Sequence, residues 1–309
     1  MPEVITAGEI LVEIMATETD QTFEKPGTLM GPYPSGAPAI FLDQAARMGA
    51  ETGMIAAVGD DEFGEMTKRR LAEDGADVSQ VATKDDFTTG TAFVTYFSDG
   101  SRRFIYHFTH AAAGQLSPED VDPEYVKSAD FLHVMGCSLS GSESLKEAIL
   151  KAIEAADQSG VKISFDPNLR IELLELERFR DLSQRVLQKA DIVLSGREEL
   201  DELTEGNAAE GARNLIAEGA ETVILKAGEK KTEVFHGDEH WWAEPFPAEE
   251  VDPTGAGDCF DGAFIAALSR GHGAEKAVQY GMAAGALSVQ ARGPMEGAAF
   301  KSELDQLLK

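Results

Sequence analysis

The chain is short of basic charge, of cysteine and of long apolar runs, and each shortage excludes a class of protein. Its 309 residues carry 27 Lys and Arg against 55 Asp and Glu, a formal net charge of −28. A surface this acidic repels phosphate backbones and anionic lipids, so we expect no nucleic-acid or membrane partner. No apolar run approaches the roughly 18 residues of a membrane span, and no charged-then-apolar leader precedes Val4.

The two cysteines are far apart in the sequence. Cys137 and Cys259 form neither a CxxC pair nor a disulfide framework, which favours a reducing cytoplasm. The acidic residues are scattered rather than gathered into a tail, which indicates a solvated acidic surface. Ordinary solubility and life in a salt-rich cytoplasm both explain such a surface.

What the chain does have is an alternation of apolar runs and amphipathic patterns, with 43% hydrophobic residues overall. From residue 129 onward, predicted strands at 130–135, 161–165, 191–194 and 222–226 are separated by predicted helices. Short strands alternating with helices predict an α/β fold, with a mostly parallel, Rossmann-like sheet flanked by helices.

The first third of the chain predicts a small β appendage to that core. Residues 17–38 are irregular and rich in Pro and Gly. Two β-rich runs, 91–97 and 103–108, are joined by Ser98-Asp99-Gly100-Ser101, which is a hairpin pattern. We therefore expect one domain over 1–309 that carries a small β-stranded unit from about 17–33 and 91–108.

The segment DPTGAGD at 252–258 is the strongest chemical pattern. Small residues at 255–257 let the backbone approach a ligand, and a helix beginning there presents free N–H groups to a phosphate. Because Asp258 would repel a phosphate that merely bound, we interpret it as the partner of a hydroxyl that attacks a phosphoryl group. A helix N-terminus favours the ionised carboxylate, so we expect a low pKa for Asp258. The alternative is that Asp258 only caps the helix.

Other phosphate motifs are absent from the sequence. No Gly-Lys pair occurs, which excludes a P-loop, and Phe260 stands at the third glycine of the dinucleotide motif GxGxxG. The segment at 61–64 is DEFG rather than the DFG of protein kinases.

Two segments carry a family resemblance. DPTGAGDCFDGAF at 252–264 resembles the C-terminal signature of the ribokinase/PfkB carbohydrate kinases, and SGAPA at 35–39 with VGDDEFG at 58–64 resembles the N-terminal one. The similarity extends over the whole chain and favours the tagatose kinase, fructokinase and 2-keto-3-deoxygluconate kinase branches. It implies a ribokinase-like fold with a β-stranded lid over the sugar, ATP and Mg²⁺ as cofactors, K⁺ as a further candidate ion, and a candidate homodimer through the lid.

The resemblance implies roles on the phosphate side of the site. It assigns Asp258 as the catalytic base, with the amides of Gly255, Ala256 and Gly257 as an anion hole. Arg170, in DPNLR at 166–170, is expected to steady the transferred phosphoryl group. The nucleotide-binding residues implied are Lys226, Gly228, Ala284 and Leu287. Glu199 is expected to bind Mg²⁺ through water, although Gly196 replaces the Asn of the family's NxxE motif, and Asp252 is a candidate for a monovalent cation.

The resemblance also implies a sugar site. The residues expected there are Glu13, Gly36, Ala37, His107, Phe108, His110, Asp166, Asn168 and Asp258. Where many relatives have Asn, this chain has Ile40, and where 2-keto-3-deoxygluconate kinases have a carboxylate-binding Arg it has Phe108. These differences favour a neutral ketohexose phosphorylated at its terminal hydroxyl, D-tagatose first and D-fructose next. The alternatives are a 2-keto-3-deoxygluconate kinase and a catalytically decayed sugar- or nucleoside-binding regulatory protein.

Overall fold

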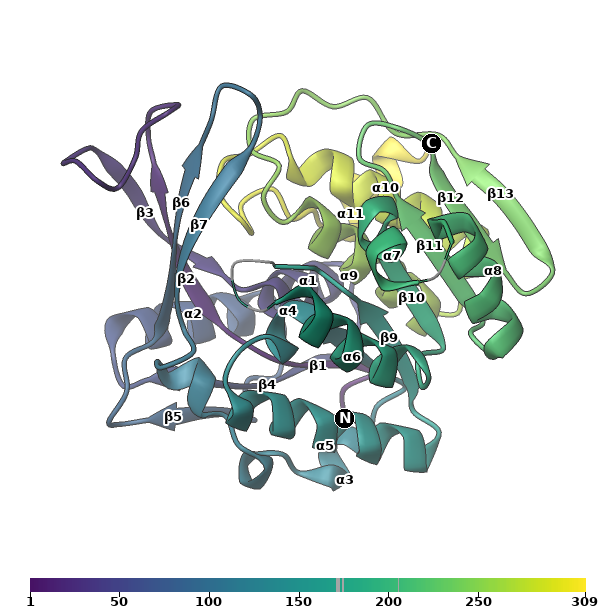
Figure 1. Ribbon diagram of the computed structural model, residues 1–309, viewed down its shortest axis with the longest axis horizontal. Coiled ribbons are helices and arrows are strands. Elements are labelled where there is room, and N and C mark those ends of the chain that lie inside the picture. The colour runs from purple at the N-terminus through teal and green to yellow at the C-terminus, as the bar shows by residue number, and fades with distance from the viewer. Residues whose placement is uncertain (171–172, 174, 205) are drawn as a thin grey trace.

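The computed structural model describes residues 1–170, 173, 175–204 and 206–309, which form two sheets of unequal size. The larger sheet has the strand order β13-β12-β11-β10-β9-β8-β1-β4-β5, and the smaller one, β3-β2-β6-β7, projects from one side of the body (Figure 1). In the larger sheet only the β11–β12 and β12–β13 pairs are antiparallel. The predicted class, a mostly parallel α/β sheet with a small second sheet, is confirmed.

The body is built from nine strands and the helices between them. Its strands are β1 (Val4–Ala7), β4 (Thr52–Gly59), β5 (Val81–Lys84), β8 (Phe131–Met135), β9 (Lys162–Asp166), β10 (Ile192–Gly196), β11 (Thr222–Lys226), β12 (Thr232–His236) and β13 (Glu239–Ala243). The longer helices are α1 (Ala37–Arg47), α2 (Glu62–Glu73), α5 (Glu143–Ser159), α6 (Leu176–Leu187), α7 (Arg197–Leu203), α8 (Ala208–Glu218), α9 (Ala256–Ser269), α10 (Ala274–Ser288) and α11 (Lys301–Leu307).

Apolar side chains cover both faces of this sheet. Along β11, Ile224 packs into a core cluster with α1, α9 and α10, whereas its neighbours Val223 and Leu225 pack into a second cluster with α5 and α8. Successive side chains of a strand point to opposite faces, so a sheet buried on both sides requires an unbroken apolar run. That requirement explains why these strands were predictable from the sequence.

The small sheet differs from its predicted extent. Its strands are β2 (Leu11–Ala16), β3 (Leu29–Ser35), β6 (Gly90–Tyr96) and β7 (Arg102–His107). The prediction placed this unit in 17–33 and 91–108, but β2 belongs to it as well, and residues 17–28 are the connection between β2 and β3. The run at 3–15 therefore serves two sheets, because the chain leaves the body after β1 and enters the small sheet at β2.

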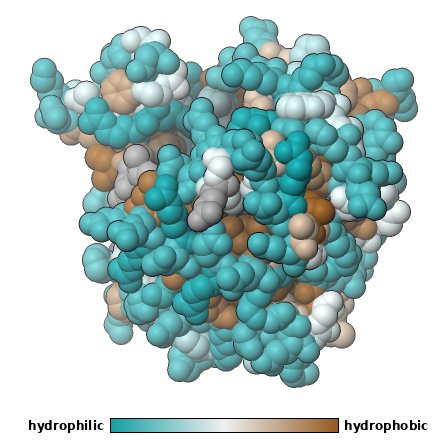
Figure 2. Space-filling model, turned by 45° about the vertical axis from the view of Figure 1, so that its right-hand side comes forward, coloured by the Kyte–Doolittle hydropathy of each residue, from teal (hydrophilic) through white to brown (hydrophobic). Residues whose placement is uncertain are grey.

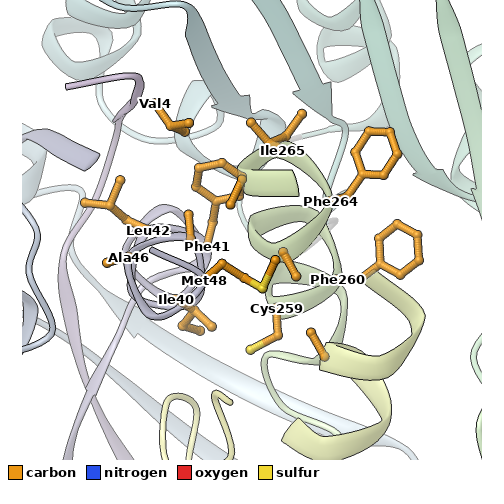
Figure 3. Close-up of a cluster of buried hydrophobic side chains, with 14 of the residues drawn as sticks. Val4, Ile40, Phe41, Leu42, Ala46, Met48, Cys259, Phe260, Phe264 and Ile265 are labelled. Carbon is orange, nitrogen blue, oxygen red and sulfur yellow. The ribbon is translucent and has the colours of Figure 1, made fainter. Parts of the chain in front are cut away.

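Helices α1 and α9 pack closely and bring two loops of the site together. Their contact buries Phe41 and Met48 of the α1 region against Cys259 and Ile265 of α9 (Figure 3). A Cβ atom at Gly262 would lie 2.3 Å from the carbonyl oxygen of Phe41, so only glycine permits this approach. The N-terminus of α9 consequently lies against the first turn of α1.

The surface agrees with the composition. On the face shown in Figure 2, hydrophilic residues predominate and the apolar ones form small, separate patches. Among the described helices, none has the length and apolar character needed to cross a membrane.

Candidate active site

Two cavities meet at the turn before α9. The first, of about 320 Å³, lies between the small sheet and the carboxyl ends of the parallel strands, where open α/β sheets place ligands. The second, of about 570 Å³, lies beside the end of β11 and helix α10. Lys226, Pro253, Ala256 and Gly257 line both cavities. Ligands in the two cavities would therefore meet at this turn.

The turn offers backbone N–H groups to an anion. Gly255 precedes α9 with a φ of +83°, and a Cβ atom there would lie 2.5 Å from the carbonyl oxygen of Pro294. Within the described part of the chain, the N–H groups of Gly255 and Gly257 have no acceptor, and that of Ala256 makes only a 3.4 Å bond to the carbonyl oxygen of Pro253. Unpaired N–H groups at a helix N-terminus form a site suited to phosphate.

Asp258 lies in the first turn of α9 and lines the first cavity. Its side chain is buried, and its Oδ1 atom accepts a 3.2 Å hydrogen bond from Nδ2 of Asn168. Burial and the nearby carboxylate of Asp166 raise the pKa of Asp258 to about 7. The prediction of a low pKa was wrong, because the loss of water around the carboxylate outweighs the effect of the helix N-terminus.

A buried ammonium group lies beside the turn. Nζ of Lys226 donates to Oδ2 of Asp166 and to Oδ2 of Asp261, each at 2.9 Å. Burial alone lowers the pKa of this lysine, but the two carboxylates raise it above its usual value, so the group is a cation. A Cβ atom at Gly257 would lie 3.5 Å from Nζ. The sequence analysis missed Asp261, although its position three residues after Asp258 places it on the same face of a helix.

Arg170 and Glu199 line the first cavity where β9 and β10 end. Arg170 donates from Nη1 to its neighbouring carbonyl oxygen, that of Leu169, at 3.1 Å. Glu199 accepts from the backbone N–H groups of Leu169 at 3.0 Å and Gly196 at 2.9 Å. This carboxylate therefore fastens two loops of the site together, a role that its position in a NxxE-like motif did not reveal.

Glu13 presents an unpaired oxygen to the first cavity. It is 3% exposed and accepts a 3.1 Å hydrogen bond at Oε2 from the hydroxyl of Ser35. Its Oε1 atom has no partner among the described residues. Burial, with the nearby charge of Asp252, raises the pKa of Glu13 to about 8. A buried oxygen without a partner is suited to a hydroxyl group of a ligand.

Several other predicted residues line the same cavity. These are Gly36, Ala37, Phe108, Asp166 and Asn168, together with Ile40. Gly36 has a φ of +105°, and a Cβ atom there would lie 2.5 Å from the carbonyl oxygen of Glu9, so this approach also requires glycine.

Strand β7 turns a different face to the cavity from the one predicted. Arg102, Phe104 and Tyr106 line the cavity, as does Phe108 just beyond the strand. His107 is exposed on the opposite face and meets Phe93 edge to face. His110 is also exposed and is absent from the cavity wall. The placement of both histidines on the sugar was therefore wrong, because alternation from Phe108 selects even-numbered residues.

Glu9 is a further cavity residue that the sequence analysis missed. It accepts hydrogen bonds from the thiol of Cys137 at 3.4 Å and from the hydroxyl of Ser138. Burial raises the pKa of Glu9 above its usual value. Its position just after β1, at the carboxyl end of a parallel strand, is the signal that could have identified it.

The second cavity confirms two of four expected positions and corrects two. Lys226 and Gly228 line it. Ala284 is fully buried and Leu287 packs against the core, so neither belongs to the cavity wall. The residues of α10 and its C-terminus that do line the cavity are Met282, Gly285, Ala286 and Val289. Their spacing of three to four residues marks the other face of the helix, which the sequence analysis did not select.

Asp252 connects the lid to the turn rather than facing a cavity. Its Oδ1 atom accepts from the N–H of Thr254 and the hydroxyl of Tyr96, at 3.0 and 3.1 Å, and its Oδ2 atom accepts from the N–H of Gly293 at 3.0 Å. The described residues contain no group of three His, Cys, Asp or Glu side chains positioned to hold a metal. The monovalent-cation role of Asp252 stays a prediction.

These features describe an enzyme that transfers a phosphoryl group to an alcohol: a phosphate-binding turn, a buried carboxylate beside it, and a cavity on either side. The model of the pfkB family carbohydrate kinases matches residues 1–299, and the chain belongs to that family.

The chain is similar to named members of this family. It is 33% identical over 266 residues to "Probable fructokinase-3" of Arabidopsis thaliana, which covers 85% of this chain and 76% of that protein. It is 27% identical over 318 residues to 5-dehydro-2-deoxygluconokinase of Bacillus licheniformis, covering 99% and 95%. A solved structure titled as a "putative Ribokinase II in complex with ATP and Mg+2" from E. coli is 42% identical, with a TM-score of 0.94 and coverage of 100% and 99%.

Proposed function

We propose that this carbohydrate kinase transfers the γ-phosphoryl group of ATP to the terminal hydroxyl of a neutral ketohexose, D-tagatose or D-fructose. The observation that carries the proposal is the meeting of the two cavities at the turn 255–257, with Asp258 facing the first. The names of relatives support it, since one is a fructokinase and a close structural neighbour holds ATP and Mg²⁺.

In this reaction the sugar occupies the first cavity and ATP the second. The sugar hydroxyl, directed by Asp258, attacks the γ-phosphorus, and the bond from that phosphorus to the bridging oxygen breaks. The hydroxyl proton passes to Asp258, and the electron pair of the broken bond leaves on ADP. The N–H groups of the turn, Lys226 and Arg170 stabilise the charge on the transferred group. A carboxylate whose pKa is about 7 is a stronger base than an exposed one, which suits this role.

Mg²⁺ is expected to enter with ATP. Glu199 lines the first cavity, and each of its oxygens accepts one backbone hydrogen bond and keeps another lone pair. This arrangement fits an ion that keeps several waters and is held mainly by the substrate's phosphates. Mg²⁺ supplies charge neutralisation on the phosphate oxygens.

The cavity wall favours a neutral sugar. Ile40 and the lid aromatics Phe104 and Phe108 supply apolar surface. Glu9 and Glu13 supply carboxyl groups that bind hydroxyls and repel anions. A sugar acid is the second candidate, because Arg102 also lines the cavity and one relative is named 5-dehydro-2-deoxygluconokinase.

A substrate panel tests the proposal. ADP release is measured by a coupled assay with D-tagatose, D-fructose, 2-keto-3-deoxygluconate, pentoses and nucleosides, at several salt concentrations. We expect the highest kcat/KM with a neutral ketohexose and phosphorylation of its terminal carbon by NMR. Preference for the sugar acid would replace the first candidate with the second. Sugar binding without ADP release would indicate a binding protein.

We also propose that the protein is a cytoplasmic homodimer paired through the lid. Strands β3 and β7 are the two edges of the lid sheet, and Leu29, Met30 and Ile105 on these strands are 43%, 38% and 40% exposed. Exposed apolar edge strands favour pairing with another chain. Light scattering should give twice the chain mass of 33.2 kDa, and Ile105→Glu should halve it; a monomeric wild type would refute the pairing.

A further inference from the structure

Arg102 occupies a position that the family resemblance did not assign. It begins β7, on the same face of that strand as Phe104 and Tyr106, and it lines the first cavity. Its Nη1 atom donates a 3.0 Å hydrogen bond to the hydroxyl of Thr254, the residue that immediately precedes Gly255. A side chain from the lid therefore contacts the phosphate-binding turn.

A second lid residue fixes this contact. The hydroxyl of Tyr96, at the end of β6, donates to Asp252 at 3.1 Å and lies 3.4 Å from the hydroxyl of Thr254. Tyr96 and Arg102 are paired across the β6–β7 hairpin. The two residues thus hold the tip of the lid against the segment 252–254. Arg102 is delivered to the turn only when the lid lies over the cavity.

The charges around the turn explain why a phosphoryl group requires this arginine. Five carboxyl groups line the cavity: those of Glu9, Glu13, Asp166, Glu199 and Asp258. Lys226, on the opposite side of the turn, already pairs with Asp166 and Asp261. By contrast, Arg102 makes a single hydrogen bond to the described residues, so most of its N–H groups are available to a ligand. A guanidinium group with several free N–H groups matches the oxygens of a phosphate.

The place of Arg102 in the cavity distinguishes a phosphoryl contact from a sugar contact. Arg102 and Arg170 also line the opening between the lid tip and α7, so the two guanidinium groups lie on the same side of the turn. We propose that Arg102 is a further catalytic residue, which binds the transferred phosphoryl group and so makes phosphoryl transfer depend on closure of the lid. This inference rests on the proposed kinase function.

In the reaction, Arg102 takes no proton and forms no covalent bond. The bond between the sugar oxygen and phosphorus forms, the bond to the bridging oxygen of ADP breaks, and the hydroxyl proton passes to Asp258. The guanidinium group donates hydrogen bonds to the oxygens of the group in transfer, where negative charge is shared.

The test compares Arg102→Met with Arg103→Met. Arg103 is the next residue on the same strand, lies on the other face, stacks on Phe97 and is absent from the cavity wall. We expect Arg102→Met to lower kcat by about 100-fold to 1,000-fold, the range for loss of a charge-stabilising donor, with the sugar KM changed less than about threefold. Arg103→Met should retain wild-type kcat, and added guanidine should restore part of the activity of Arg102→Met.

A binding measurement gives a readout that does not need the sugar. Calorimetry should show that Arg102→Met weakens a non-hydrolysable Mg·ATP analogue at least tenfold and Mg·ADP less than twofold, because only the analogue has a γ-phosphoryl group. Equal kcat values for the two variants, or equal weakening of both nucleotides, would overturn the role. A rise in sugar KM alone would make Arg102 a sugar-binding residue. A wild-type protein that makes no ADP with any sugar would refute the kinase proposal itself.

Discussion

The two cavities that meet at the turn 255–257 differ in what lines them. The first has carboxyl groups from four strand ends and the first turn of α9, with two arginines. The second is lined mainly by small and apolar residues, such as Ala227, Phe246, Met282 and Ala286. Charged groups at fixed positions select and activate a substrate, whereas an apolar slot binds by shape. Substitutions in the first cavity should therefore change turnover, and those in the second should change affinity.

The largest expected effect follows from Asp258→Asn. Removal of the general base should lower kcat by about 100-fold to 10,000-fold while both KM values stay within about threefold. Steady-state kinetics would measure this. Cys259→Ala is the matched control, since Cys259 is the next residue, fully buried in the core, and should keep near-normal turnover. Near-normal kcat for Asp258→Asn would remove the contrast between the cavities.

Glu13→Ala tests selection in the first cavity. Loss of the buried carboxyl group should raise the sugar KM by about 10-fold to 100-fold, the range for a hydrogen bond to a charged partner. The KM for ATP serves as the internal control and should not change. A parallel rise in both KM values would indicate that Glu13 supports the structure rather than the sugar.

Ala286→Leu tests binding by shape in the second cavity. The larger side chain should reduce the space for the nucleotide and raise the KM for ATP about tenfold, as overpacking costs about 1–3 kcal/mol, with kcat and sugar KM unchanged. Leu287→Met, on the core side of the same helix, preserves volume and should leave the KM for ATP unaltered. The opposite result would return the nucleotide to the face that the sequence analysis selected.

The smallest expected effect concerns stability. Because the pKa of Asp258 in the folded protein lies above its unfolded value of about 3.9, the folded state binds the proton more tightly. The stability that this proton gives is complete below pH 4 and is lost as the pH rises to about 7. Asp258→Asn should therefore raise Tm by a few degrees at pH 8 and not at pH 4. Calorimetry at both values checks this, and equal shifts would argue against a desolvated carboxylate.

The difference between the cavities also explains what the sequence could predict. The turn at 255–257 and Asp258 were predictable because glycines and an acid at the start of a helix are a local pattern. The buried strands were predictable because they are continuous apolar runs. Both signals lie within a few consecutive residues.

Facing and long-range contacts were harder to predict. His107 was assigned to the wrong face of β7, and Leu287 to the wrong face of α10, because facing depends on how an element packs and a shift of one residue reverses it. The pairing of Lys226 with Asp261 joins residues 35 positions apart in sequence. The pKa of Asp258 depends on burial, which the helix position alone did not reveal.

The central claim is that a buried carboxylate, Asp258, accepts the proton of the sugar hydroxyl. The most direct test is kcat/KM for the sugar between pH 5.5 and 9 at saturating Mg·ATP, because this quantity reports the groups of the enzyme before the sugar binds. Since the pKa of Asp258 is raised to about 7, the rate should fall about tenfold for each unit below that value and level off above it. A rate that stays constant through pH 7 would contradict the claim.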